Sequence, residues 1–247
     1  IFEGNLRYRT HLAQRDTVLV VRLAHHEHDL IGAQVLLVRT TTRVDRELLQ
    51  NTSIRFVGSA TSGIDHIDLK YLKSENIEFA HSPGNNANAV VQYDLSVFAN
   101  LKPDWRALTI GIIGCGKVGG RLYALLKELD VKIGVHDPFL SEKQVPELIS
   151  LNEVLKSDIV CIHTPLTFNG KHPTANLLDK DKINRLPAGA LLINAGRGGV
   201  LDEDALFRRL KSKNDLHVAL DVWDAEPIIN LPLMNRVALA TPHIAGY

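Results

Sequence analysis

Short apolar runs alternate with polar stretches along the chain. Four of these runs in the first hundred residues are rich in β-branched or aromatic side chains and predict parallel strands: Val18–Val21, Val35–Val38, Arg55–Ser59 and Ile77–Ala80. Between some of them, Asp45–Gln50 and Asp68–Ser74 predict helices. The alternation of strand and helix favours a parallel α/β sheet.

The second half repeats this pattern after a predicted helix at Asn86–Leu101 and a break at Lys102–Asp104. Six further apolar runs predict strands: Ile110–Ile113, Lys132–His136, Ile159–His163, Leu191–Asn194, Leu216–Val222 and Val237–Ala240. Asp202–Lys211 predicts a helix with Asp202 as its N-cap. We therefore expect two doubly wound parallel-sheet domains, 1–101 and 102–247, with the boundary at the break.

Composition narrows the class of protein. Of 247 residues, 45% are hydrophobic, and 28 Lys and Arg balance 28 Asp and Glu, so nothing indicates a nucleic-acid or anionic-membrane partner. The apolar runs are too short for a membrane span, and no signal peptide is visible. Cys115 and Cys161 fall in or beside predicted central strands, which favours reduced thiols in a cytoplasmic protein. The cluster His25, His26 and His28 lacks a carboxylate or Cys pattern to complete a ligand set, so we expect no metal.

Residues 109–120 carry the strongest chemical signal. The strand Ile110–Ile113 leads directly into Gly-Cys-Gly-Lys-Val-Gly at 114–119, and apolar residues then recur at helical spacing. A strand, a G-x-G-x-x-G turn and a helix in this order are typical of a dinucleotide-binding crossover. Gly114 is expected to form the tight turn, Gly116 to admit a pyrophosphate, and Gly119 to let the helix pack on the strand.

Asp137 ends the next predicted strand, 23 residues after Gly114. This is the expected place for a carboxylate that accepts hydrogen bonds from an adenosine ribose. An acid here repels a 2′-phosphate, and Pro138 rather than an arginine follows it. The sequence therefore predicts NAD, in preference to NADP, as the cofactor.

Three side chains with complementary chemistry each follow a predicted strand of the second domain: Arg197, Glu226 and His243. Oxidation of an alcohol requires a base for the hydroxyl proton, and histidine suits this role because its ordinary pKa is about 6.5. A carboxylate hydrogen-bonded to the histidine stabilises its charged form. An arginine binds a substrate carboxylate through a bidentate fork. The three predict a dehydrogenase site.

Several stretches resemble motifs of the D-isomer-specific 2-hydroxyacid dehydrogenases: Phe56–His66, His163–Leu166 with Gly170 and Pro173-Thr174, Asn194–Gly198, Asp221–Pro227 and His243–Tyr247. The resemblance runs from about Arg39 to Tyr247 and implies a flavodoxin-like substrate domain followed by a Rossmann NAD domain. The ending His-Ile-Ala-Gly-Tyr is the most subfamily-specific match. It implies NAD-dependent oxidation of 4-phospho-D-erythronate to 2-oxo-3-hydroxy-4-phosphobutanoate in the biosynthesis of pyridoxal 5′-phosphate (vitamin B6).

The resemblance also assigns roles. It implies that Arg197 binds and polarises the substrate, that Glu226 tunes His243, and that His243 is the proton donor and acceptor. Three residues are expected to contact the phosphorylated 2-hydroxy acid: Thr40, Thr61 and Tyr247. Twelve are expected to contact NAD: Gly114, Gly116, Lys117, Val118, Gly119, Asp137, Thr164, Pro165, Ala195, Gly196, Asp221 and Gly246.

The chain departs from this pattern in places. Thr40 stands where the family usually has Ser, and Asn85, Asn86 and Gln92 replace residues more often Cys and Glu. The family's first strand and the subfamily's C-terminal dimerisation domain are missing, so we expect a truncated chain and a homodimer only in the full-length protein. Two alternatives stay open: a relative acting on glyoxylate, hydroxypyruvate or 3-phosphoglycerate, and an NAD-sensing binding protein with little or no turnover.

Overall fold

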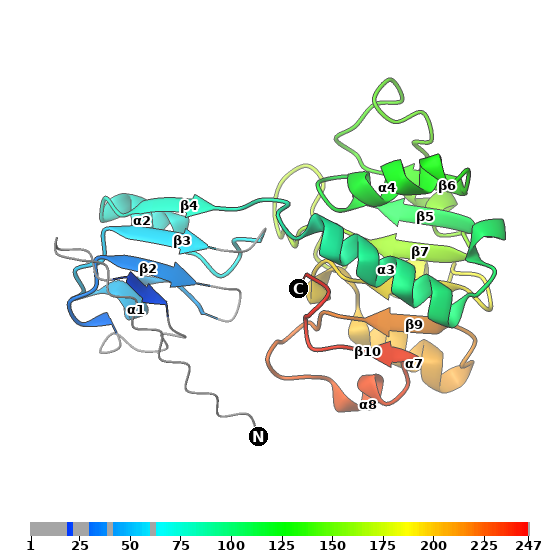
Figure 1. Cartoon of the computed structure of the whole chain (residues 1–247). Coiled ribbons are helices and arrows are strands. Elements are labelled where there is room, and N and C mark those ends of the chain that lie inside the picture. The colour runs from blue at the N-terminus through cyan, green and yellow to red at the C-terminus, as the bar shows by residue number, and fades with distance from the viewer. Residues whose placement is uncertain (1–18, 22–29, 39–41, 60–62, 247) are drawn as a thin grey trace. The chain divides into compact units, whose positions relative to one another are not determined.

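The apolar runs of the chain form two parallel sheets, each in its own structural unit (Figure 1). The computed structural model describes residues 19–21, 30–38, 42–59 and 63–246. The contacts within the chain divide it between Ser82 and Pro83. Both units have the parallel α/β architecture that the alternation of strands and helices predicts, which confirms the expected fold class.

The first unit contains one sheet of four parallel strands in the order β1-β2-β3-β4. The strands are β1 Leu19–Val21, β2 Val35–Val38, β3 Phe56–Ser59 and β4 Glu78–His81. Its helices are α1 Arg46–Leu49 and α2 Leu69–Ser74, capped by the side chains of Asp45 and Asp68. Leu36 and Val57 of the sheet and Leu48 and Leu72 of the helices are buried in one core.

The second unit contains a sheet of six parallel strands in the order β10-β9-β8-β7-β5-β6. The strands are β5 Thr109–Ile113, β6 Lys132–His136, β7 Ile159–Ile162, β8 Leu191–Asn194, β9 His217–Leu220 and β10 Leu239–Ala240. The helices are α3 Ala87–Leu101, α4 Gly119–Glu128, α5 Leu151–Val154, α6 Lys180–Ile183, α7 Glu203–Ser212 and α8 Leu231–Met234. Short 3-10 turns lie at Trp105–Ala107 (η2) and Gly198–Val200 (η3).

Both faces of this sheet are covered by helices. The four residues of β7 are all buried, and they alternate between two cores. Ile159 and Cys161 pack with Phe98 of α3, whereas Val160 and Ile162 belong to the core that contains Leu206 of α7. A sheet buried on both faces requires continuous apolar strands, which is the pattern seen in the sequence.

The strand order reverses beside β5. The chain passes from β5 to β6 on one side, and then crosses to β7 on the other side. Open α/β sheets bind ligands at such a switch point, beyond the carboxyl ends of the strands. The segments that follow β5 and β7 are the glycine turn and His163-Thr164-Pro165, so the topology places the predicted cofactor residues at this edge.

Helix α3 belongs to the second unit, although the sequence break suggested a domain boundary after Leu101. Val91, Val97 and Phe98 of α3 share a buried core with Leu122 and Leu126 of α4. The apolar face of α3 packs on the six-stranded sheet. The division between Ser82 and Pro83 therefore falls before this helix. The sequence shows where a helix ends but not which sheet it packs on.

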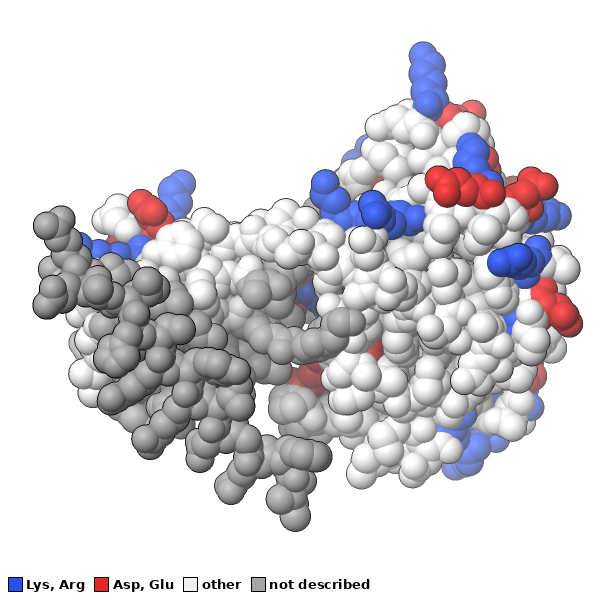
Figure 2. Space-filling view, in the orientation of Figure 1, with Lys and Arg blue, Asp and Glu red and all other residues white. Residues whose placement is uncertain are grey.

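The surface carries both signs of charge. On the face of the second unit seen in Figure 2, basic and acidic side chains lie beside one another. This agrees with the equal numbers of the two kinds in the sequence. Within the described parts of the chain, no helix combines the length and the apolar character needed to cross a membrane.

Candidate active site

The glycine turn after β5 has the geometry that its sequence predicts. Gly114 adopts a φ of +88°, which favours glycine. A Cβ on Gly119 would lie 1.9 Å from the carbonyl oxygen of Gly114, so only glycine lets α4 start this close to the strand. A Cβ on Gly116 would meet nothing within 4 Å. The backbone at Gly116 therefore faces free space at the amino end of α4, where a pyrophosphate fits.

Asp137 sits at the end of β6 beside this turn. Its Oδ2 accepts a hydrogen bond from the backbone N–H of Cys115 at 2.9 Å, and its Oδ1 accepts one from the N–H of Phe139 at 3.0 Å. These bonds fix the carboxylate against the glycine turn, and each oxygen keeps a lone pair for another donor. The arrangement fits a ribose whose hydroxyl groups donate to Asp137.

The end of β7 faces the same turn. A Cβ on Gly114 would lie 2.7 Å from Cγ2 of Thr164, and a Cβ on Gly196 would lie 3.1 Å from the carbonyl oxygens of Ile162 and Thr164. The ends of β5, β7 and β8 therefore meet closely. The hydroxyl oxygen of Thr164 is buried and has no hydrogen-bond partner among the described residues, which is the state expected of a group that binds a ligand here.

Arg197 lies in a loop that Asn194 fixes. Asn194 is fully buried at the end of β8; its Nδ2 donates to the carbonyl oxygen of Arg197 at 2.9 Å, and its Oδ1 accepts from the N–H of Gly196 at 3.1 Å. The Arg197 Nη1 donates to the Gly196 carbonyl oxygen at 2.8 Å. Gly198 then abuts the backbone of Trp223, since a Cβ there would lie 2.1 Å from the Trp223 carbonyl carbon. This contact joins the Arg197 loop to the loop that carries Glu226.

Glu226 and His243 form a hydrogen-bonded pair. Nδ1 of His243 lies 2.8 Å from Oε2 of Glu226, and the N–H of Trp223 donates to Oε1 at 2.9 Å. Burial raises the pKa of Glu226, but the hydrogen bonds from His243 and Trp223 and the charges of His243 and Arg197 outweigh it, so the net pKa is lowered. Because an ionised carboxylate only accepts, Nδ1 carries the proton, and Nε2 of a neutral His243 is left as a base.

Asp221 is buried at the end of β9 and holds the segment around His243. The N–H of His243 donates to its carbonyl oxygen at 2.7 Å, and the N–H groups of Ile244 and Ala245 donate to its carboxylate at 2.8 and 2.9 Å. Thr241 Oγ1 also donates to this carboxylate, at 2.6 Å. The carbonyl and carboxylate oxygens of Asp221 thus accept their hydrogen bonds from the segment that carries His243.

The structure brings together the predicted catalytic residues and most of the predicted NAD residues at one edge of the six-stranded sheet. Lys117 and Val118 lie within the glycine turn, Pro165 and Ala195 follow β7 and β8, and Gly246 packs against Asn86, with a Cβ there 2.5 Å from Nδ2. The three predicted substrate residues lie outside the described residues: Thr40, Thr61 and Tyr247.

Sequence reasoning missed several polar residues of this region. Tyr93 of α3 reaches Thr241, with 2.9 Å between the two hydroxyl oxygens. Asp94, the next residue, lies 3.1 Å from Nε2 of His163 through Oδ2, and both side chains are buried. The pair is close but poorly aligned for a hydrogen bond, and neither side chain has a hydrogen-bond partner among the described residues. Polar residues inside an apolar helix carry no spacing signal that would have identified them.

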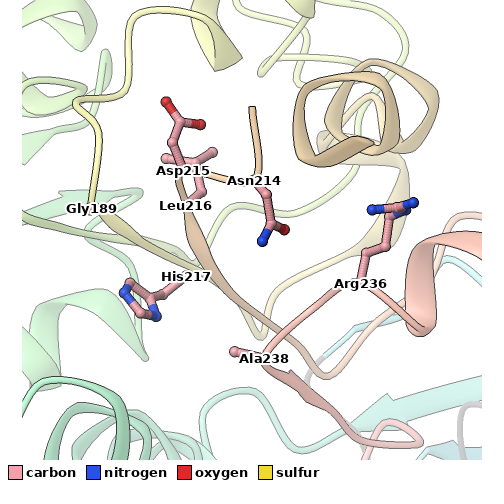
Figure 3. Close-up of a pocket in the computed structure, with 7 residues that line it drawn as sticks. All are labelled: Gly189, Asn214, Asp215, Leu216, His217, Arg236 and Ala238. Carbon is pink, nitrogen blue, oxygen red and sulfur yellow. The ribbon is translucent and has the colours of Figure 1, made fainter. Parts of the chain in front are cut away.

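A cavity of about 410 Å³ lies elsewhere, at the opposite edge of the sheet (Figure 3). Gly189 precedes β8, His217 begins β9 and Ala238 precedes β10, so the cavity opens at the amino ends of the strands. None of its lining residues belongs to the predicted site. Its one carboxylate, Asp215, is already held by Nε of Arg209 at 3.1 Å.

The chain belongs to the D-isomer specific 2-hydroxyacid dehydrogenases, because the model of that family's NAD binding domain matches residues 91–245, more than half of the chain. These residues coincide with the six-stranded sheet and nearly all of the described site. The second unit is therefore an NAD-binding domain, as the glycine turn and Asp137 predicted.

Within this family the chain is similar to proteins named erythronate-4-phosphate dehydrogenase. It is 45% identical to that of Marinomonas sp. (strain MWYL1), over 96% of this chain and 64% of the relative. It is 48% identical to that of Marinobacter nauticus (strain ATCC 700491 / DSM 11845 / VT8), over 87% of this chain and 58% of the relative. The chain thus spans less than two thirds of the length of these relatives.

Solved structures of the family share the fold. The D-lactate dehydrogenase of Aquifex aeolicus, complexed with NAD and lactic acid, superposes with a TM-score of 0.74 at 26% identity, over 89% of this chain and 78% of that one.

Proposed function

We propose that the protein catalyses NAD-dependent oxidation of 4-phospho-D-erythronate to 2-oxo-3-hydroxy-4-phosphobutanoate in pyridoxal 5′-phosphate biosynthesis. The observation that carries the chemistry is the Glu226–His243 pair beside Arg197, set at the cofactor edge of an NAD-binding domain. The choice of substrate is supported by 45–48% identity to relatives of that name.

Each residue of the site has its own role in the proposed reaction. When bound, NAD supplies the hydride acceptor. Nε2 of His243 takes the proton of the C2 hydroxyl, and Glu226 holds the imidazole through Nδ1 and stabilises its charged form. Arg197 binds the substrate carboxylate and polarises the developing carbonyl oxygen. His243 returns the proton in the reverse direction.

The proposal for the cofactor uses the geometry at the strand ends. Gly114, Gly116, Lys117, Val118 and Gly119 hold the pyrophosphate, and Asp137 accepts from the ribose. The nicotinamide end is bordered by five further residues: Thr164, Pro165, Ala195, Gly196 and Gly246. The buried, unpartnered hydroxyl of Thr164 supports this placement, as does the free space at Gly116.

We extend the proposal to the rest of the site. Thr40, Thr61 and Tyr247 contact the substrate. The free thiols Cys115 and Cys161 support action in the cytoplasm. A homodimer of the complete protein follows from the subfamily resemblance, and sedimentation of the complete gene product tests it.

A substrate panel tests the function. The complete gene product is given NAD with 4-phospho-D-erythronate, 3-phosphoglycerate, glycerate, glycolate and D-lactate, and NADH formation is followed by absorbance. We expect kcat/KM for 4-phospho-D-erythronate to exceed the others by about a hundredfold or more, because acids without a phosphate leave phosphate-binding groups unpaired and 3-phosphoglycerate is one carbon shorter. A preference for any other acid of the panel would keep the enzyme class and remove this substrate. NAD binding without any turnover would favour an NAD-sensing protein.

A further inference from the structure

His243 has an unusual backbone conformation for a catalytic side chain. Its φ is +55°, in the left-handed region, which residues with a side chain seldom adopt. Such a conformation persists only where the surroundings fix it. The fixing group is Asp221, whose carbonyl and carboxylate oxygens accept the consecutive N–H groups of His243, Ile244 and Ala245.

The carboxylate of Asp221 is itself held by a chain of two hydroxyl groups. Thr241 Oγ1 lies 2.6 Å from Asp221 Oδ1, and the Tyr93 hydroxyl lies 2.9 Å from Thr241 Oγ1. Asp221, as a carboxylate, can only accept, so Thr241 donates its single hydroxyl proton to Oδ1. Tyr93 must then be the donor to Thr241. The direction of both bonds is fixed by this count of protons.

The chain of bonds connects helix α3 to the catalytic loop. Tyr93 lies on α3, which packs across the sheet (Figure 1), and Thr241 directly follows β10. Asp221 follows β9 and is only 1% exposed, so water does not replace a lost hydroxyl donor easily. Trp223 adds a second tie, because its Nε1 donates to the Thr241 carbonyl oxygen at 3.2 Å.

We propose that Tyr93 and Thr241 are positioning residues for His243, acting in series through the carboxylate of Asp221. They orient Oδ1 and Oδ2 toward the N–H groups of Ile244 and Ala245, and this holds His243 where Glu226 can bind Nδ1. The catalytic consequence rests on the proposed function, whereas the structural consequence does not.

The first test measures the backbone directly and needs no substrate. Amide hydrogen exchange at Ile244 and Ala245 is compared by NMR in the complete protein and in three variants that each lose one hydroxyl: Tyr93→Phe, Thr241→Val and, as the matched control, Tyr123→Phe. Tyr123 bonds to Glu147 and Lys127, away from this chain of bonds. We expect exchange to rise roughly fivefold in Tyr93→Phe and about tenfold in Thr241→Val, and to stay unchanged in Tyr123→Phe.

The second test measures turnover with the substrate found in the panel. We expect kcat to fall about tenfold in Tyr93→Phe and further in Thr241→Val, with KM for NAD changed by less than about twofold, because the base is misplaced and not the cofactor. Thr241→Ser keeps the hydroxyl and restores both exchange and kcat. The double variant falls no further than Thr241→Val alone, because the two residues act in series.

Two outcomes overturn the proposal. One is unchanged exchange at Ile244 and Ala245 in both Tyr93→Phe and Thr241→Val. The other is Thr241→Ser behaving like Thr241→Val, which would assign the effect to packing. Faster exchange in Tyr93→Phe and Thr241→Val, together with no turnover of any acid in the panel even by the unchanged protein, would leave the positioning role standing and remove the proposed function instead.

Discussion

Glu226 decides which nitrogen of His243 faces the chemistry. A carboxylate that accepts from Nδ1 leaves Nε2 for the substrate, and its lowered pKa keeps it ionised to a pH below its ordinary range. The fold holds the carboxylate through a second bond from the N–H of Trp223. The sequence predicted this pair from residue types alone, because an acid and a histidine each follow a strand that ends at the same edge of the sheet.

The pKa of the Tyr93 hydroxyl provides a test of its burial. Burial raises its pKa to about 12, and the charges of Asp221 and Asp94 add to this. The stabilisation of the neutral phenol is fully present below the ordinary pKa of 10.0 and is lost as the pH rises toward about 12. We expect the tyrosinate absorbance that is lost in Tyr93→Phe to titrate near that value.

The control is circular dichroism at each pH, which shows that the protein is still folded. Titration of Tyr93 near its ordinary pKa in the folded protein would mean that its hydroxyl is solvated, and would contradict the buried bond to Thr241.

Residues with a motif were predictable, and residues without one were not. Gly114, Asp137 and His243 occupy positions that a strand, a turn or a neighbouring proline marks in the sequence. Tyr93 and Asp94 are polar positions inside a helix that is otherwise apolar on its buried face. Their partners lie far along the chain, so no spacing rule connects them.

At the scale of elements, the glycine turn and α4 form the proposed phosphate site of the cofactor. Gly119 begins α4 and lets it lie on β5, so the positive end of the helix dipole lies near the open space beside Gly116. This arrangement requires the backbone of the glycine turn and the backbone of α4 to lie in close contact.

Adding a methyl group at Gly119 tests this approach. The new Cβ of Gly119→Ala would lie 1.9 Å from the Gly114 carbonyl oxygen, so α4 must move away from the turn. We expect a loss of about 2 kcal/mol in the free energy of unfolding, and NAD binding weakened about tenfold or more. Urea unfolding and calorimetric titration with NAD measure the two effects.

Gly120→Ala is the matched control in the same helix. Its nearest neighbour beyond the helix would be the Cys115 carbonyl oxygen at 3.3 Å, and alanine favours helix over glycine by about 1 kcal/mol. We expect unchanged or slightly raised stability. Equal effects of the two substitutions on stability and NAD binding would show that the close backbone contact at Gly119 does not require glycine.

The apolar runs predicted the boundaries of the strands to within one or two residues. The expected Leu216–Val222 is β9 His217–Leu220, and the expected Val237–Ala240 is β10 Leu239–Ala240. Three of the helices of four residues, α5, α6 and α8, were not predicted, because one turn of helix has too few positions to show a period. The Asp202 cap was confirmed: its side chain accepts from the N–H of Ala205 at 2.8 Å.

At the scale of the whole chain, the two units have separate cores. The buried residues of the first unit form one cluster, and the two clusters of the second unit lie on the two faces of its sheet. Each unit therefore buries apolar surface without the other, which is the property of a domain.

This separation predicts which fragment folds. We expect a fragment of residues 83–247 to unfold cooperatively and to bind NAD within about threefold of the whole chain's affinity, because it retains both cores and the cofactor edge. A fragment of residues 102–247 lacks α3, and so exposes the surface that Val97 and Phe98 cover. We expect the free energy of unfolding of this fragment to be several kcal/mol lower, at about 2 kcal/mol for each large side chain removed.

Thermal unfolding of the two fragments, with and without NAD, distinguishes the two boundaries. Equal stability would place α3 outside the cofactor domain, as the break at Lys102–Asp104 first suggested.

The proposed function requires that His243, held by Glu226, is the acid and base of an NAD-dependent 2-hydroxyacid dehydrogenase. The most direct measurement is NADH formation from 4-phospho-D-erythronate by the complete gene product and its His243→Ala variant, with NAD affinity measured on both. We expect turnover by the unchanged protein, a fall of about a thousandfold or more in the variant, and NAD affinity within about threefold. Normal turnover in His243→Ala would contradict it.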